Sequence, residues 1–377
     1  MVGIVQVFDQ TKYNFDSLDG FSDFIIYGAG NTGRDVCSFI KSNLDGKVLT
    51  FVDVRADKEY SIEGIPVCQL ENVKIPKAIK DGALVIVAIF NRDVNLAPIV
   101  DNLHRTGFKN VISYVQFHRF FPNQLGNKYW LGDINIYKRH EAQIQETIDL
   151  LADDESRRIF KSILCYRASG DSEELTQPEG LDTQYFSKTI PSSKKSLRFI
   201  DGGAYDGDTL VAMIKLGIFC EAVASFEPDL ENFAKLTTFS MANRSNIANE
   251  NYLFPCAVWS KTEYLKFNSD SKEASNIDVN GSETVLGVSI DNLIPDFRPN
   301  FIKMDIEGAE IDGLMGSKET IKTFRPSLGI CIYHTPEHLW EIPLLIKSFD
   351  LDYKFYVRAH GHNGFDLVLY AIPSKLP

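Results

Sequence analysis

Apolar runs and polar interruptions alternate along the chain in a pattern that predicts α/β structure. Short apolar stretches, at residues 24–27, 83–89, 301–304 and 327–333, are bounded by polar or turn-forming residues, as buried strands are. Between them lie segments with helical spacing of apolar residues, such as 209–214. Strands that alternate with helices in this way favour parallel sheets covered by helices.

A longer helical stretch follows the first α/β segment. Residues 137–168 carry apolar side chains at helical spacing, with a break near Asp153. The aromatic, proline-interrupted residues 117–130 are predicted to fill a domain junction without forming a regular element. A chain of 377 residues is long enough for two domains. We therefore expect two Rossmann-like, doubly wound α/β domains and a helical linker segment, with bounds at residues 1–125, 126–183 and 184–377.

The C-terminal segment contains the sequence FIDGGAYDGDT at residues 199–209. An apolar strand ends on Asp201, a glycine-rich turn follows, and a helix begins near Thr209. Glycines let the backbone adopt positive φ and let a ligand approach the main chain closely. A second apolar stretch ends on Glu227, twenty residues after Gly207. A carboxylate there can accept hydrogen bonds from both hydroxyls of a ribose, so this pair of features predicts adenosine binding.

The residues of this turn distinguish between adenosine cofactors. The turn lacks the dinucleotide pattern G-x-G-x-x-G, and the carboxylates of Asp201, Asp206 and Asp208 would repel a pyrophosphate. A ligand with a cationic ammonium and a sulfonium group is favoured instead. The sequence therefore predicts S-adenosylmethionine as the cofactor.

Four ordered motifs make this segment resemble the FkbM family of S-adenosylmethionine-dependent methyltransferases. They are FIDGGAYDGDT, SFEPD at 225–229, VSIDNL at 288–293 and FIKMDIEGAE at 301–310, within a resemblance that covers residues 184–373. The resemblance implies a class I methyltransferase fold with an antiparallel closing strand. It also implies O-methylation of a sugar, glycan or polyketide-type hydroxyl. The expected cofactor-binding residues are Asp201, Gly203, Tyr205, Gly207, Thr209, Glu227, Ala257 and Val258.

Methyl transfer to a hydroxyl needs a group that accepts the hydroxyl proton. His334 follows the apolar stretch 327–333 and precedes Thr335 and Pro336, which suit an N-cap and a first helical residue. Its ordinary pKa, near about 6.5, suits a base at neutral pH. We predict that His334 is the general base. The alternative is a strand-end histidine bonded to the backbone.

Three acidic residues follow the apolar stretch that ends at Met304. Asp305 and Glu307 alternate along an extended chain, so both face the same crevice only if the strand has already ended. They are predicted to be catalytic, as base, orienting group or metal ligand, with Asp305 favoured. Glu310 is predicted to have a structural role at the N-terminus of the next helix. The spacing of these carboxylates matches no metal motif, and no metal is predicted.

A second glycine turn lies near the N-terminus. Residues 28–33 read G-A-G-N-T-G between an apolar strand and a helix, and Asp53 ends the next strand. The order resembles the nucleotide-sugar-binding domain of certain sugar O-acyltransferases. It implies a nucleotide-containing ligand at Gly28, Gly30, Gly33 and Asp53. A nicotinamide-dependent oxidoreductase is one alternative, and glycines that only permit tight helix packing are another.

Composition and charge narrow the class of partner. A net charge of −12 and a pI near 5.1, with no basic block, argue against nucleic acid. The six cysteines lack C-x-x-C spacing, which fits a reducing compartment. The first residues lack a basic signal-peptide start, and no apolar run is long enough to span a bilayer. We expect a cytoplasmic enzyme with a small-molecule or glycan acceptor. A glycan-assembly protein with a silent methyltransferase domain is the remaining alternative.

Overall fold

The computed structural model describes residues 17–56, 60–72, 75–192, 196–268, 276–277 and 281–375. The chain divides into two compact units. Unit 1 comprises Met1–Glu141, Ile159–Gln177 and Gly361–Phe365; unit 2 comprises Ala142–Arg158, Pro178–His360 and Asp366–Pro377. Residues 126–183, expected as a linker, are divided between the two units. None of the helices within the described ranges has the length and apolar character that a membrane crossing requires.

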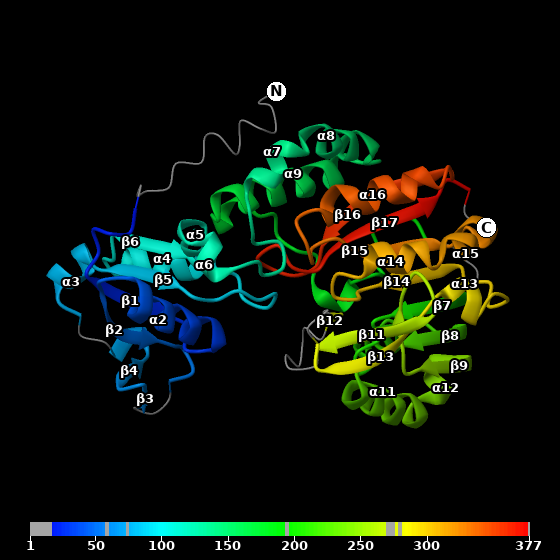
Figure 1. Ribbon diagram of the computed structural model, residues 1–377, viewed down its shortest axis with the longest axis horizontal. Helices are drawn as coiled ribbons and strands as arrows, with labels where there is room; N and C mark the ends of the chain where they lie inside the picture. Colours follow the sequence, from blue (N-terminus) through cyan, green and yellow to red (C-terminus); the bar gives the residue numbers. More distant parts are fainter. Residues whose placement is uncertain are drawn as a thin grey trace. The chain divides into compact units, whose positions relative to one another are not determined.

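Unit 1 is built on a six-stranded sheet of order β3-β4-β2-β1-β5-β6, in which β3 alone runs antiparallel to its neighbour (Figure 1). The strands are β1 (Asp23–Tyr27), β2 (Lys47–Val52), β3 (Tyr60–Ile62), β4 (Ile65–Cys68), β5 (Leu84–Val87) and β6 (Asn110–Ser113). The helices include α2 (Asn31–Asn43), α3 (Lys77–Gly82), α4 (Ala97–Arg105) and α7 (Asn135–Arg139). Apolar side chains of β1 and β5, including Ile25 and Val85, form the buried core.

The prediction that residues 117–130 form no regular element is wrong. The structure has α5 (Tyr114–Phe120) and α6 (Pro122–Leu125) there. Ser113 and Gln116 cap α5 reciprocally, each side chain accepting the other's backbone N–H. Pro122 stands in the first turn of α6, where the missing N–H costs no helical hydrogen bond. The prediction gave the aromatic residues and the proline more weight than this capping pair.

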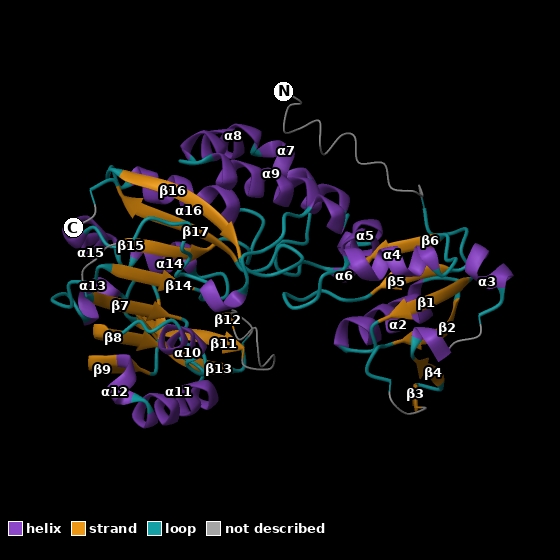
Figure 2. Ribbon diagram, turned by 180° about the vertical axis from the view of Figure 1, so that it is seen from behind, coloured by secondary structure: helices purple, strands orange, loops and turns teal. Residues whose placement is uncertain are grey.

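Unit 2 is built on a seven-stranded sheet of order β16-β17-β15-β14-β7-β8-β9 (Figure 2). Its strands are β7 (Leu197–Gly202), β8 (Cys220–Phe226), β9 (Ala248–Phe254), β14 (Phe301–Met304), β15 (Ser327–Cys331), β16 (Tyr353–Ala359) and β17 (Leu367–Pro373). The strands from β9 to β15 in this order are parallel, and β17 is antiparallel to both β15 and β16. The antiparallel closing strand is confirmed.

Helices and a smaller sheet complete unit 2. The helices include α10 (Asp208–Lys215), α11 (Leu230–Ala242), α12 (Arg244–Ile247), α13 (Ile290–Leu293), α14 (Glu310–Met315), α15 (Lys318–Phe324) and α16 (His338–Ser348). The smaller sheet contains β10 (Ala257–Val258), β11 (Glu263–Asn268), β12 (Asn276–Ile277) and β13 (Glu283–Val288). The helical stretch forms α8 (Glu141–Leu150) and α9 (Asp154–Ser169), with the predicted break between them.

The parallel strands of unit 2 determine where its polar side chains gather. Strands β7, β8, β14 and β15 lie side by side, and their carboxyl ends meet at one edge of the sheet. Ligands of open α/β sheets bind outside this edge. Glu227, Asp305 and His334 all follow such strand ends and therefore belong to one region.

Candidate active site

Glu227 connects the glycine turn after β7 to the end of β8. One carboxylate oxygen accepts the Tyr205 N–H at 2.8 Å, and the other accepts the Asp229 N–H at 2.9 Å. Burial raises the pKa of Glu227 to about 7, outweighing the two amide hydrogen bonds that lower it. The carboxylate predicted to bind ribose is therefore buried, anchored to the turn, and easily protonated.

The glycines of this turn let it pack closely against the end of β14. Gly203 has φ +74°, and a Cβ built there would lie 1.9 Å from the Asp305 carbonyl oxygen, so a side chain is excluded. Gly207 has φ +98° and precedes α10. Tyr205 adopts φ 48°, an uncommon conformation for a residue with a side chain. This packing brings Asp305 beside the turn.

A buried ion pair lies under the turn. Nζ of Lys303 on β14 is 2.9 Å from a carboxylate oxygen of Asp201 at the end of β7, and both side chains are almost fully buried. Lys303 also donates to the Gly203 carbonyl. Burial alone would lower the pKa of Lys303, but the carboxylates of Asp201, Asp305 and Asp208 together outweigh it and raise the pKa. Asp201 is therefore paired inside the protein, and its charge is balanced before any ligand binds.

Asp305 receives hydrogen bonds from two tyrosines. The Tyr185 hydroxyl donates to it at 2.9 Å and the Tyr333 hydroxyl at 3.4 Å. Nε2 of His334 lies 3.4 Å away. Burial would raise the pKa of Asp305, but His334 and Lys303 outweigh it, so the pKa is lowered. Asp305 is held as a carboxylate.

Glu307 reaches the same histidine as Asp305. Strand β14 ends at Met304, and Glu307 adopts φ 54°, so the alternation of an extended strand no longer applies. A Glu307 carboxylate oxygen lies 3.7 Å from Nε2 of His334. The Glu307 side chain is 25% exposed and that of Asp305 19%, against 2% for His334. Burial raises the pKa of Glu307 to about 7.

His334 lies behind these carboxylates, in the loop between β15 and α16. Burial alone would lower its pKa, but Glu310, Glu307 and Asp305 outweigh it and raise the pKa to about 10. Without a bound cation the ring keeps its proton at neutral pH. His334 then donates hydrogen bonds, and its assignment as general base stays a prediction.

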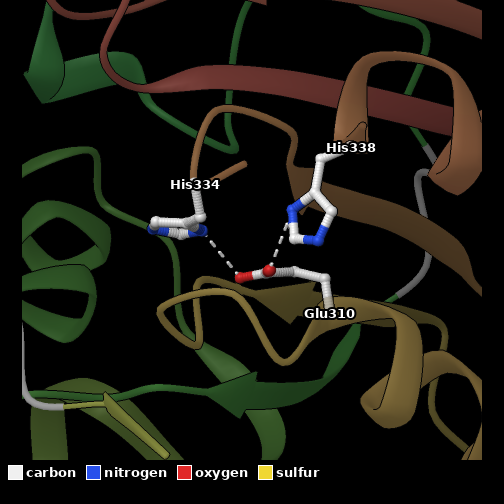
Figure 3. Close-up of side chains that lie close together, drawn as sticks. All are labelled: Glu310, His334 and His338. Atoms are coloured by element: carbon white, nitrogen blue, oxygen red, sulfur yellow. Dashed lines mark ion pairs between the residues drawn. The ribbon is translucent and has the colours of Figure 1, made fainter. Parts of the chain in front are cut away.

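Glu310 and His338 lie in the site, although neither is among the site residues predicted from the sequence. Glu310 lies between two histidine rings, with one oxygen 2.9 Å from Nδ1 of His334 and the other 3.3 Å from Nδ1 of His338 (Figure 3). Its carboxylate also accepts the Ile306 N–H at 2.8 Å. Glu310 was expected to be structural, at the N-terminus of the next helix; it begins α14, and its carboxylate contacts both histidines.

The predicted start of the last helix is also wrong. Helix α16 begins at His338, two residues after Pro336, and its N-cap residue Glu337 makes no side-chain capping bond. Thr335 is therefore not the N-cap. Because the loop extends to Glu337, His334 precedes the helix while His338 lies in its first turn.

The other predicted cofactor residues are buried near the turn. Thr209 lies in the first turn of α10, and its amide donates to the Asp208 carboxylate at 2.7 Å. Ala257 and Val258 form β10 and are buried. A Cβ built on Gly202 would lie 3.5 Å from a methyl group of Val258, so β10 packs against the end of β7.

In the glycine turn of unit 1, two of the three glycines are required by the fold and one is not. Gly28 has φ +107°, and a Cβ on Gly33 would lie 2.0 Å from the Gly28 carbonyl oxygen, so both glycines are required by the fold. The Asp53 carboxylate accepts the Ala29 N–H at 2.9 Å. A Cβ on Gly30 would meet nothing within 4 Å, so packing does not account for Gly30.

A protein-family model matches a large part of unit 2. Residues 201–361 match the family model described as the methyltransferase FkbM domain. Unit 2 carries an FkbM methyltransferase domain. The matched range includes Asp201, Glu227, Asp305 and His334, so the strand-end residues described above all lie inside the FkbM domain.

One solved structure shows the same fold over nearly the whole chain. The crystal structure of methyltransferase FkbM from Methylobacillus flagellatus KT matches 98% of this chain and 98% of its own, with 22% identity and a TM-score of 0.78. Aeropyrum pernix fibrillarin, solved with natively bound S-adenosyl-L-methionine, matches 51% of this chain and 74% of its own. That match has 12% identity and a TM-score of 0.31, too low to carry an argument. No curated protein matches the chain.

Proposed function

We propose that the FkbM domain transfers a methyl group from S-adenosylmethionine to a hydroxyl of a sugar or glycan-type acceptor. The observation that carries the cofactor assignment is the Glu227 carboxylate, which accepts the Tyr205 amide of the glycine turn. Each carboxylate oxygen has a second lone pair, and ribose hydroxyls are suitable donors to it. The position of Glu227 after β8 matches the ribose site of nucleotide-binding α/β sheets.

The residues around the glycine turn are suited to bind this cofactor. Glu227 would hold the ribose, the turn from Gly203 to Gly207 would lie along the methionine moiety, and β10 would lie beside the adenine. When bound, S-adenosylmethionine supplies a methyl group attached to a sulfonium sulfur, and the sulfur keeps the electron pair of the broken bond as the neutral thioether. Because the methyl group is already activated, the protein has to align the acceptor and accept a proton.

The partly exposed carboxylates of Asp305 and Glu307 are suited to accept this proton. An acceptor oxygen that bonds to the methyl carbon must release its proton to a neighbouring group. The Glu307 side chain is the more exposed of the two carboxylates beside His334. We assign the proton-accepting role to Glu307, oriented by His334, whose Nε2 atom also contacts Asp305. His334 itself, with a 2% exposed side chain, is the alternative base.

Calorimetry and product analysis test this proposal together. The purified chain should bind S-adenosylmethionine and its demethylated product with one site each. Incubation with methyl-labelled cofactor and a panel of free and nucleotide-linked sugars should yield a labelled ether, with one proton released per turnover. A chain that binds neither form of the cofactor would refute the cofactor assignment. Binding without transfer to any hydroxyl, but with transfer to an amine or carboxylate, would refute O-methylation.

A second function, nucleotide binding by unit 1, is favoured by Gly30. A glycine that neither packing nor its backbone conformation requires leaves open space at the start of α2, where backbone amides suit a phosphate. We infer that this space takes the phosphates of a nucleotide-sugar or a dinucleotide. The full-length chain, saturated with the demethylated cofactor, is titrated with UDP-sugars and NAD.

Gly30→Val is the variant that tests this second function. Its φ of −75° suits any residue and its Cβ has room, so the variant should fold and lose the ligand. If no nucleotide binds, or if Gly30→Val binds it as tightly as the wild type, the glycine turn of unit 1 is structural.

A further inference from the structure

The cluster of Glu310, His334 and His338 has the composition of a transition-metal site. The three residues come from the start of α14, the loop after β15 and the start of α16. Each offers one ligand atom, and these atoms lie within 4.8 Å of one another. The residues are 0%, 5% and 4% exposed, respectively. Figure 3 shows both imidazole rings turned toward the carboxylate, one at each oxygen.

We propose that Glu310, His334 and His338 bind a divalent transition-metal ion of the Zn²⁺ type. Two imidazole nitrogens and one carboxylate oxygen are the donors that Zn²⁺ and its neighbours prefer. Mg²⁺ and Ca²⁺ prefer sites made of oxygen atoms and are disfavoured here. The Nδ1 atoms lie 2.9 and 3.3 Å from the carboxylate oxygens, separations that ligands sharing one ion at about 2.0–2.2 Å adopt.

The surroundings of His334 support metal binding by its Nδ1 atom. Nε2 of the same ring lies 3.4 Å from Asp305 and 3.7 Å from Glu307. A metal-binding histidine ordinarily donates its other N–H to a carboxylate, which fixes the tautomer and the ring orientation. Asp305 is in turn held by the Tyr185 hydroxyl. A bound metal ion would thus be held by His334, His334 by Asp305, and Asp305 by Tyr185.

The charges around the cluster also favour a cation. Three carboxylates, of Asp305, Glu307 and Glu310, surround one imidazole ring in a mostly buried region. Buried carboxylates are costly unless they are paired with cations. The metal would also link the start of α14 to the segment between β15 and α16, and would fix His334 beside the proposed acceptor site.

Metal binding is tested without any assay of turnover. The full-length chain is freed of metal with a chelator and titrated with Co²⁺ and Zn²⁺ in a calorimeter, while the visible absorption of Co²⁺ reports its coordination. We expect one ion per chain, and visible absorption bands typical of Co²⁺ with a low coordination number. Zn²⁺ should raise the melting temperature, since a ligand that binds the folded state stabilises it. Mg²⁺ and Ca²⁺ should have no effect.

Two variants and one control locate the site. His338→Ala and Glu310→Gln should each weaken Co²⁺ and Zn²⁺ binding at least about tenfold. His104→Ala, which removes an exposed histidine of α4 in unit 1, should bind like the wild type. If the wild-type chain binds neither ion, or if His338→Ala binds both as tightly, the cluster is a hydrogen-bonded histidine pair and the proposal is wrong. The wild-type titration decides this even if a variant does not fold.

Discussion

The two glycine turns of this protein are built alike but hold carboxylates of different character. Asp53 in unit 1 accepts the Ala29 and Arg55 amides, each at 2.9 Å. Glu227 in unit 2 accepts one amide from its own turn and one from two residues further on, in the same pattern. In both units the strand-end acid therefore anchors the glycine turn. This shared hydrogen-bond geometry is a property of the fold, so any difference in function between the two units depends on the features in which they differ.

The first difference is electrostatic. Burial would raise the pKa of Asp53, but its amide donors and Arg55 outweigh it, and the pKa is lowered. Burial of Glu227 prevails, and its pKa rises to about 7. Asp53 is already neutralised by its own chain, whereas Glu227 has more to gain from hydrogen-bond donors on a ligand. The same architecture thus stabilises the charged form of Asp53 and leaves that of Glu227 less stabilised.

The second difference lies at the neighbouring strand ends. In unit 1, β5 is followed by Ala88, Ile89 and Phe90, which are apolar. In unit 2, β14 is followed by Asp305 and Glu307. A glycine turn with a strand-end acid can bind a nucleotide, but proton transfer needs further polar groups beside it. Among the described residues only unit 2 places such groups around a histidine at this edge.

The largest expected effect is on turnover in unit 2. Glu307→Gln removes the proposed proton acceptor but keeps the shape of the side chain, so kcat should fall about 10²–10⁴-fold with cofactor affinity nearly unchanged. Glu221→Gln, an exposed glutamate of β8 paired with Arg198, is the control and should leave kcat unchanged. Steady-state kinetics with calorimetry measures both. Full turnover of Glu307→Gln, with loss of turnover in His334→Ala, would return the role of base to His334.

A stability change of about 3–5 kcal/mol is expected from Lys303→Met, because it leaves the Asp201 carboxylate buried without its partner. The central strands of unit 1 contain no such pair; β5 is Leu84–Val87, entirely apolar. Denaturant unfolding should show unit 2 destabilised and unit 1 unchanged. Restored stability in the double variant Lys303→Met with Asp201→Asn would confirm that the unpaired charge is the cause. A shift below 1 kcal/mol in Lys303→Met alone would contradict it.

Loss of Glu227 should weaken cofactor binding. Glu227→Ala removes a charge-assisted hydrogen bond, which costs about 1.5–3 kcal/mol, or about ten- to a hundredfold in affinity. Calorimetry with S-adenosylmethionine measures this loss, and Glu221→Ala is the matched control on the same strand. A folded Glu227→Ala protein that binds like the wild type would remove Glu227 from the cofactor site.

The smallest effect is the pH dependence of cofactor affinity. Since the pKa of Glu227 is raised to about 7, the free protein holds a proton on Glu227 below that pH. Ribose hydroxyls donate to the deprotonated form, so affinity should rise about tenfold between pH 6 and pH 8 and level off above. Glu227→Gln should bind equally at both pH values. Any ligand of unit 1 should show no such change, because the pKa of Asp53 is lowered.

Local sequence patterns sufficed for the glycine turns, the strand-end acids and the closing strand. A turn with positive φ favours glycine within a few residues of the strand, and carboxyl ends of parallel strands share one edge, so Glu227 and Asp305 could be placed at that edge from the sequence alone. The errors were also local. Residues 117–130 were misjudged because the capping pair Ser113 and Gln116 lies outside the stretch.

Tertiary structure alone decided which side chains meet. Lys303 was visible as a charge inside an apolar strand, but only the register of β14 with β7 identifies Asp201 as its partner. Glu310 faces His334 and His338 because two loops from neighbouring strands converge there. Periodicity tells which face of an element a residue occupies, while partners from distant segments depend on how the elements pack. The sequence by itself therefore determined which edge of the sheet carries the candidate site. The packing of β14, β15 and α16 determined the charge state and the neighbours of each residue there.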